Sequence, residues 1–138
     1  LDMMRPGDGL ALLDLDHFKR VNDTLGHAEG DRVLMALGAY LADSVRDDDC
    51  VARFGGEEFL ILLRGAGAEA GAVIERLVGG WRLGGIGVTL SAGVAVHVAG
   101  RSPTLTLQQA DPLLYAAKAA GRDQVLTESA VHAALIGG

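Results

Sequence analysis

Two short apolar runs, residues 10–15 and 59–63, each adjoin a pair of carboxylates, and this feature restricts the fold more than any other. The first run contains Asp14 and is followed by Asp16, and the second comes directly after two adjacent glutamates. Apolar runs of this length are typical of strands buried inside a sheet. Adjacent carboxylates repel one another, so a fold that places them beside buried strands requires a compensating positive charge.

The rest of the chain predicts helices and strands around these two runs. Apolar residues recur every three or four positions from residue 28 to about residue 45, which predicts an amphipathic helix. Strands are expected at 50–54 and 57–63, joined by a hairpin turn at Gly55-Gly56, a dipeptide that tolerates positive φ. The other expected elements are a helix at 65–80, a strand at 87–98, a helix from 105 to a stop at Gly121 with Pro112 in an early turn, a short edge strand at 124–126, and a short helix or frayed tail from 127 onward.

The order of these elements predicts the fold class. It is β-α-β-β-α-β followed by a further helix and a short strand, which indicates an α+β fold with a ferredoxin-like, palm-type core and a central antiparallel sheet flanked by helices. Right-handed crossovers make the first and third strands antiparallel neighbours in the middle of the sheet. The end of the first strand then lies beside the start of the third. We therefore expect Asp14, Asp16, Glu57 and Glu58 to converge at one edge of the sheet.

Converging carboxylates favour a divalent metal site. Magnesium binds one or two carboxylates together with substrate phosphate oxygens and water, and two such ions can clamp an in-line phosphoryl transfer. Nearby cations support a phosphate ligand: Lys19 and Arg20 follow the first acids, and Lys118 and Arg122 lie four residues apart near the last helix. The alternatives are solvated acids at strand ends and cations that only complement a helix dipole. For the set of acids together, the metal site is favoured.

Length and charge narrow the class of protein. The chain has 138 residues, 49% of them hydrophobic, which suits one domain with a core of its own. A net charge of −6 argues against a broad nucleic-acid interface. No apolar run of 18 residues and no secretory signal profile is present, so no membrane insertion is expected, and the lone Cys50 is compatible with the cytoplasm. The four histidines show no metal-ligand spacing with Cys50.

Four sequence blocks together resemble a known family. They read DLDHFKRVNDTLGHAEGD, RFGGEEF, VTLSAGVA and ADPLLYAAKAAGR, and their order and spacing are similar to those of GGDEF domains, the catalytic domains of bacterial diguanylate cyclases, in the GGEEF form. The resemblance covers about residues 10–125. It implies a single GGDEF domain over residues 1–138 with its core at about 10–126. It also implies a piece of a longer cytoplasmic protein with an N-terminal sensor or receiver domain.

The resemblance implies a reaction and its cofactor. Two GTP molecules are joined into cyclic di-GMP, with release of two pyrophosphates, when each 3′-hydroxyl attacks the α-phosphate of the other nucleotide. The reaction is assisted by Mg²⁺ or Mn²⁺, with two ions expected per GTP, and it takes place across a homodimer of domains.

Individual roles follow from the same resemblance. Asp14 and Glu57 correspond to the metal-binding catalytic acids, the carbonyl of Leu15 to a main-chain ligand, and Glu58 to a supporting catalytic acid. Asn22 and Asp31 correspond to the pair that recognises guanine. The full set of implied substrate-binding residues is Phe18, Lys19, Asn22, Asp31, Gly55, Gly56, Lys118 and Arg122.

A charged loop before the glycine turn has a separate interpretation. Arg46 and Asp49 form an Arg-x-x-Asp pair at the offset where the family carries its inhibitory product site, so cyclic di-GMP is expected to bind there as an inhibitor. The alternative is an ordinary solvated loop after a helix.

Two other functions remain open from the sequence. One is a non-catalytic GGDEF module that binds GTP or cyclic di-GMP to regulate a neighbour. The other is a cyclase that acts on a single nucleotide. The presence of Asp14, Glu57, Asn22, Asp31 and Lys118 favours the diguanylate cyclase.

Overall fold

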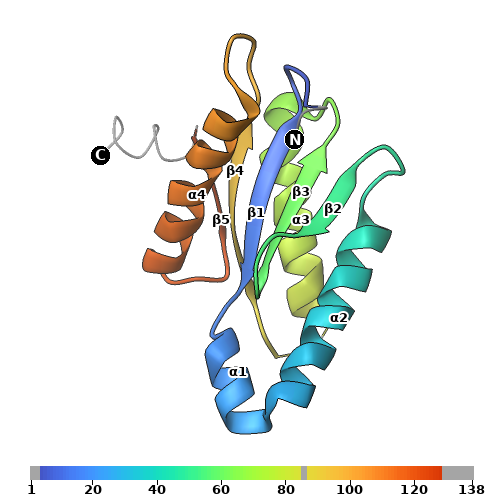
Figure 1. The fold of residues 1–138 in the computed structure, drawn as a ribbon, viewed down its shortest axis with the longest axis vertical. Coiled ribbons are helices and arrows are strands. Elements are labelled where there is room, and N and C mark those ends of the chain that lie inside the picture. Colours follow the sequence, from blue (N-terminus) through green and yellow to red (C-terminus); the bar gives the residue numbers. More distant parts are fainter. Residues whose placement is uncertain (1–3, 85–86, 129–138) are drawn as a thin grey trace.

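The computed structural model describes residues 4–84 and 87–128. A five-stranded sheet has helices on both faces, as shown in Figure 1. The elements are β1 (Gly9–Leu15), α1 (Phe18–Leu25), α2 (His27–Ser44), β2 (Cys50–Arg53), β3 (Glu58–Leu63), a 3₁₀ turn (Gly67–Glu69), α3 (Ala70–Leu83), β4 (Leu90–Val96), α4 (Pro103–Ala119) and β5 (Val125–Thr127). The expected α+β class is confirmed. No helix among the described residues is both long and apolar enough to span a bilayer.

The sheet has the strand order β2-β3-β1-β4-β5, with β1 at its centre. β1 pairs antiparallel with β3 and with β4, so that Leu12 lies opposite Leu60 on one side and Gly93 on the other. β5 joins β4 in parallel. The expected antiparallel pairing of the first and third strands is therefore confirmed.

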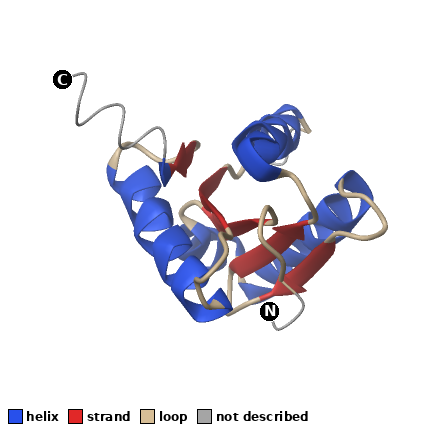
Figure 2. Cartoon of the chain, turned by 90° about the horizontal axis from the view of Figure 1, so that it is seen from above, coloured by secondary structure: helices blue, strands red, loops and turns tan. Residues whose placement is uncertain are grey.

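Every residue of β1 is buried because both faces of the sheet are covered. α2 and α3 pack on one face, where Leu37 and Ile74 contact the core that contains Leu13. α4 packs on the other face, where Leu114 contacts the core that contains Leu12. Figure 2 shows these helices on opposite sides of the strands.

α4 lies very close to the sheet at Gly93 of β4. A Cβ atom at this position would lie 2.3 Å from the backbone oxygen of Ala110 and 2.3 Å from the backbone nitrogen of Leu114. Only glycine permits this approach without moving the helix. The height of α4 above the sheet is therefore set by contact between backbones.

The helix boundaries correct several expectations. α1 is a short helix that was not expected from the sequence, and Gly26, with φ 91°, separates it from α2. The helix expected at 65–80 begins later, at residue 70, after the 3₁₀ turn. Pro112 lies inside α4 and not in an early turn, because Ser102 caps the helix by accepting a hydrogen bond from the Leu105 nitrogen at 3.2 Å.

The strand boundaries and the tail also differ from expectation. The strand expected at 87–98 is shorter, at 90–96, and Thr127 belongs to β5. The rest of the tail, from residue 129 onward, lies outside the described residues.

The hairpin between β2 and β3 forms as expected, with Gly55 and Gly56 in its turn. Neither Gly55 nor Gly56 has a positive φ. The guanidinium of Arg53 donates hydrogen bonds to the carbonyl oxygens of both glycines, and the Phe54 nitrogen donates to the Glu58 oxygen at 2.8 Å. The turn is held by these bonds, and β3 begins at Glu58, so Glu57 lies in the turn.

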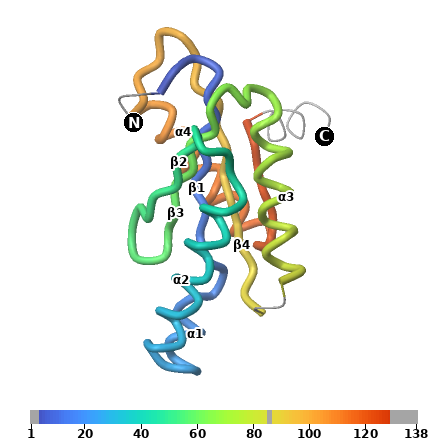
Figure 3. Tube along the Cα trace, turned by 90° about the vertical axis from the view of Figure 1, so that its right-hand side faces the viewer, coloured from blue at the N-terminus to red at the C-terminus, as the bar shows by residue number. Residues whose placement is uncertain are grey.

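α1 lies beyond the end of β1, away from the layers of the sheet, as Figures 1 and 3 show. His17 joins the strand to the helix with φ 57°, a left-handed conformation that is uncommon outside glycine. α1 packs against the start of α2. The C-terminal end of β1 is therefore bordered by α1, by the β2–β3 turn and by the last turn of α4.

Candidate functional site

The site is centred on Asp14, near the end of β1. Asp14 lies opposite Glu58 of β3 in the sheet register, and Glu57 precedes Glu58 in the turn. The Asp14 side chain is only 5% exposed, and the ammonium of Lys118, from α4, contacts its Oδ2 atom. Its Oδ1 atom is buried and has no hydrogen-bond partner. An unpartnered buried carboxylate oxygen is costly unless a ligand binds to it.

The three acids around this point share an electrostatic cost. Burial raises the pKa of Asp14, although the contact with Lys118 opposes the shift. Burial also raises the pKa of both Glu57 and Glu58, and the neighbouring Asp14 charge raises each further. The arrangement therefore favours either protonation or a bound cation.

Asp16 lies near the other three acids, and its charge adds to the raised pKa of Asp14, but its own carboxylate has hydrogen-bond donors that theirs lack. Its buried carboxylate accepts hydrogen bonds from the hydroxyls of Thr89 and Ser91, at 2.7 and 2.6 Å, and from the backbone nitrogen of Asp123 at 2.9 Å. These donors already stabilise its negative charge. Asp16 therefore connects the end of β1 to β4 and to the turn after α4.

A basic cavity of about 500 Å³ adjoins the three acids. Its lining residues are Leu15, His17, Phe18, Lys19, Arg20, Asp23, Glu57, Lys118 and Arg122. Lys19, Arg20 and Arg122 form no ion pair within residues 4–84 and 87–128. Free cations beside paired acids suit a ligand that carries several phosphates.

The structure brings most of the predicted phosphate and metal residues to this cavity. The sequence interpretation missed His17 and Asp23, which also line it. The available signal was that His17 directly precedes Phe18 and that Asp23 lies one helical turn after Lys19.

The predicted guanine-recognising pair lies at the contact between α1 and α2. A Cβ atom at Gly30 would fall 1.8 Å from the Asn22 Oδ1 atom and 3.2 Å from the ring of Phe18, so a larger residue there would displace the Asn22 side chain. Asn22 therefore lies next to Gly30, the residue before Asp31. The Asp31 side chain is exposed. Neither Asn22 nor Asp31 lines the basic cavity. Their role in binding guanine stays a prediction.

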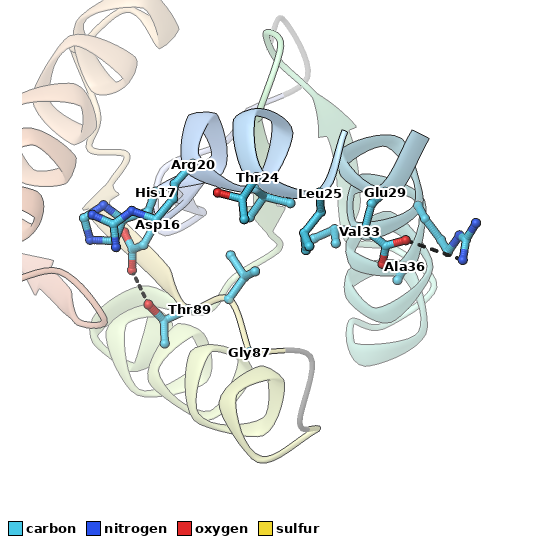
Figure 4. Close-up of a pocket in the computed structure, with 13 residues that line it drawn as sticks. Asp16, His17, Arg20, Thr24, Leu25, Glu29, Val33, Ala36, Gly87 and Thr89 are labelled. Atoms are coloured by element: carbon cyan, nitrogen blue, oxygen red, sulfur yellow. Dashed lines mark hydrogen bonds and ion pairs between the residues drawn. The ribbon is translucent and has the colours of Figure 1, made fainter. Parts of the chain in front are cut away.

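A second cavity, of about 600 Å³, lies between α1, α2 and residues 87–89 (Figure 4). It shares His17 and Arg20 with the basic cavity, and Figure 4 shows the hydrogen bond between Asp16 and Thr89 at its edge. Its wall is largely apolar. It contains none of the residues implied to bind substrate.

The donors near Asp14 fit a hard divalent cation. Asp14 has a free oxygen, Glu57 is close enough to perturb its pKa, and Leu15 lines the same cavity. No group of three His, Cys, Asp or Glu side chains suited to a metal occurs in the described part of the chain. Magnesium that is completed by substrate oxygens requires only one or two carboxylates.

Arg46 and Asp49 lie together in the loop before β2. The Asp49 side chain is only 3% exposed, and its carboxylate accepts hydrogen bonds from the backbone nitrogens of Arg46 and Arg64 at 3.0 and 2.8 Å. The Arg46 side chain is 65% exposed. Asp49 thus closes the loop, and the partly exposed guanidinium of Arg46 donates a hydrogen bond to the Arg64 carbonyl and lies 3.6 Å from the Asp49 carboxylate.

Comparison with known proteins identifies relatives of the chain. Residues 8–124 match the sequence model of the family described as "Diguanylate cyclase, GGDEF domain". Diguanylate cyclase DgcP of Pseudomonas aeruginosa is 40% identical over 124 residues, which cover 84% of this chain and 18% of DgcP. The chain therefore spans less than a fifth of the length of that curated relative.

Solved structures are also similar. The diguanylate cyclase SiaD of Pseudomonas aeruginosa, solved with its activator SiaC, is 41% identical with a TM-score of 0.80, covering 87% of this chain and 49% of that one. The coiled coil and GGDEF domain of DgcB from Caulobacter crescentus, solved with c-di-GMP, is 30% identical with a TM-score of 0.81, covering 87% and 69%.

Proposed function

Because the chain belongs to the GGDEF family of diguanylate cyclase domains, we propose that it joins two GTP molecules into cyclic di-GMP with release of two pyrophosphates. The observation that carries the proposal is the meeting of Asp14 and Glu57, 43 residues apart in sequence, beside a cavity lined by four Lys and Arg side chains. Pairs of acids near free cations suit a metal-bound triphosphate.

Asp14, Glu57 and the carbonyl of Leu15 would hold Mg²⁺ or Mn²⁺, with two ions per GTP. When bound, these ions supply charge stabilisation at the α-phosphate and lower the pKa of the attacking 3′-hydroxyl. The raised pKa values of Asp14 and Glu57 mean that neutralisation of their charges is favourable. Glu58, opposite Asp14 in the sheet, adds negative charge to the same place.

The other residues bind and orient the nucleotide. Lys19, Lys118 and Arg122 line the basic cavity and neutralise the phosphates. Phe18, Gly55 and Gly56 border the nucleotide, and a Cβ at Gly56 would meet no atom within 4 Å, so the turn leaves room for a ligand. Asn22 and Asp31 read the guanine edge, since a carboxylate accepts from the two donors that guanine presents.

The product requires two nucleotides that face one another. One domain holds one GTP, so a homodimer of domains completes the reaction. We assign residues 1–138 to a single GGDEF domain that forms part of a longer cytoplasmic protein. An N-terminal sensor or receiver domain would then control dimerisation.

Product inhibition is the finer part of this proposal. Arg46 presents an exposed guanidinium that suits a phosphate or a guanine edge of cyclic di-GMP. Asp49 would take part only if its carboxylate accepts ligand donors in addition to its two backbone bonds.

The test of the proposed function is product analysis after incubation with GTP and Mg²⁺ at several protein concentrations. We expect cyclic di-GMP, formed at a rate per domain that rises with concentration. Binding of GTP without product would instead identify a regulatory module, and a cyclic mononucleotide would identify a single-nucleotide cyclase.

A matched pair of variants locates the chemistry. Glu57→Gln should lower turnover by about 1,000-fold, because it removes a carboxylate from the proposed metal site. Glu75→Gln, at an exposed position on α3, is the control and should retain the wild-type rate. Near-normal turnover by Glu57→Gln would exclude Glu57 as a metal ligand.

A further inference from the structure

The turn after α4 has an unusual backbone. Gly121, Arg122 and Asp123 have φ values of 122°, 65° and 51° in succession. Residues other than glycine adopt this left-handed region rarely, and two in a row require external support. Arg122 lines the basic cavity, so the strained turn carries one of the cations of the candidate site.

Hydrogen bonds from α4 itself explain only the first part of the turn. The Gly121 nitrogen donates to the Lys118 oxygen at 3.4 Å, and the Arg122 nitrogen donates to the Ala117 oxygen at 3.0 Å. This pair of bonds ends a helix through a left-handed glycine. It does not require Arg122 and Asp123 to continue in the same conformation.

Asp16 holds the next peptide. Its Oδ2 atom accepts from the Asp123 nitrogen at 2.9 Å, which fixes the plane of the peptide between Arg122 and Asp123. Thr89 and Ser91 hold the Asp16 carboxylate in turn, at 2.7 and 2.6 Å. Asp16 is buried, and these three hydrogen bonds hold its carboxylate in place.

Arg82 holds the same turn from another side. Its guanidinium, at the end of α3, forms a two-pronged contact with the carboxylate of Asp123, with nitrogen–oxygen distances of 2.8 to 3.0 Å. The two residues are 41 positions apart. Arg82 does not line the basic cavity.

We propose that Asp16 and Arg82 are positioning residues that clamp the turn at 121–123, so that Arg122 is held ready for the nucleotide phosphates. The proposal rests on the proposed function, because it assigns Arg122 a phosphate ligand. Without the clamp, Arg122 relaxes toward ordinary backbone angles and its guanidinium leaves the cavity. Asp16 and Arg82 thus act on substrate binding without touching the substrate.

Substitution of Arg82 tests the clamp more directly than substitution of the buried Asp16. Its side chain is 48% exposed and that of Asp123 is 34% exposed, so their ion pair contributes little to folding and the variant should fold. The measurement is the Kd for a non-hydrolysable GTP analogue with Mg²⁺, together with KM and kcat from initial rates before product accumulates. Arg76→Ala, at an exposed arginine on the same helix, is the matched control.

We expect Arg122→Ala to weaken nucleotide binding by about 10- to 100-fold and Arg82→Ala by about 3- to 10-fold, with KM rising in step. Arg82→Ala should have no further effect when Arg122 is already alanine, because the clamp acts only through that side chain. Arg82→Lys should recover part of the loss, since lysine keeps the charge without the two-pronged contact.

The outcomes distinguish failure of the proposed clamp from failure of the proposed function. If Arg82→Ala binds nucleotide as well as Arg76→Ala does, or if its effect persists in the Arg122→Ala background, the clamp is wrong. If the unaltered chain binds no GTP analogue, the proposed function fails first. Asp16→Asn is the second variant, and where it folds it should show the same dependence on Arg122.

Discussion

The two ends of β1 use the same residue type in opposite ways. Asp8, just before the strand, and Asp14, near its end, are 3% and 4% exposed. Asp8 accepts hydrogen bonds from the backbone nitrogens of Arg5 and Gly65, both at 2.8 Å, and from the Arg64 guanidinium at 3.0 Å. Asp14 contacts Lys118 and leaves one buried oxygen without a partner.

This difference in partners reverses the effect of burial. Burial acts to raise the pKa of Asp8, but its hydrogen bonds from Arg5, Gly65 and Arg64 more than offset this, and its pKa is lowered. Burial also acts on Asp14, where the interactions with Lys118 and Glu57 offset it only in part, and its pKa is raised. One end of the strand is therefore built to be stable, and the other is built to receive a positive charge.

The largest expected effect is on the reaction rate, at Asp14 near the C-terminal end of β1. Asp14→Asn should lower the rate of cyclic di-GMP formation by about 1,000-fold, because a proposed metal ligand is lost. Without Mg²⁺ its melting temperature should be no lower than that of the wild type, since burial raises the pKa of Asp14 and its ionised form therefore lowers the stability of the fold. A clear loss of stability would show that Asp14 supports the fold in the way that Asp8 does.

A smaller effect, on stability, is expected at Asp8, just before the start of β1. Asp8→Asn should lower the free energy of unfolding by about 2 to 4 kcal/mol, because Arg64 loses a buried charged partner. Enzyme activity per folded molecule should change little, since Asp8 lies at the opposite end of the strand from the site. Denaturant unfolding followed by initial rates checks both parts, and a variant that is stable but inactive would contradict the distinction.

The smallest expected effect is on the pH dependence of stability, which should have opposite signs for Asp8 and Asp14. The pKa of Asp8 is lowered from 3.8 on folding, so its contribution to stability is present above pH 3.8 and is lost as the pH falls through the folded value. The pKa of Asp14 is raised from 3.8, so its unfavourable contribution appears as the pH rises above 3.8. The stability difference from wild type should therefore shrink for Asp14→Asn as the pH falls toward 3.8, and for Asp8→Asn only as the pH falls below 3.8. Unfolding curves between pH 3 and 7 would show whether the two differences have opposite signs at neutral pH.

The parts of the fold predicted from sequence are those set by local patterns. Apolar runs located the strands, and handedness rules placed the third strand beside the first. Asp14 and Glu57 could be found because each adjoins a strand end. α1 was missed because its eight residues bury only Phe18, so they lack the repeating apolar positions that predicted the helix from residue 28.

The roles that escaped prediction depend on distant partners. Asp16 is held by residues 73, 75 and 107 positions away, and Asp8 by residues 56 and 57 positions away. No local spacing distinguishes a carboxylate that will be saturated with donors from one that will not. The role of Arg82 could not be predicted either, because its partner Asp123 is 41 residues away. That partner lies in a turn that is defined only by its backbone geometry.

The backbone contact at Gly93 links the hydrophobic interior to the chemistry. α4 carries Lys118 two turns beyond Ala110, so the height of the helix at Gly93 determines the reach of the lysine toward Asp14. A methyl group added at Gly93 has no charge and touches no nucleotide, yet it would tilt the helix and withdraw an ammonium group. A genetic screen for inactive variants should therefore return this glycine alongside the charged residues, and its phenotype would resemble that of a lysine defect more than that of an unfolded protein.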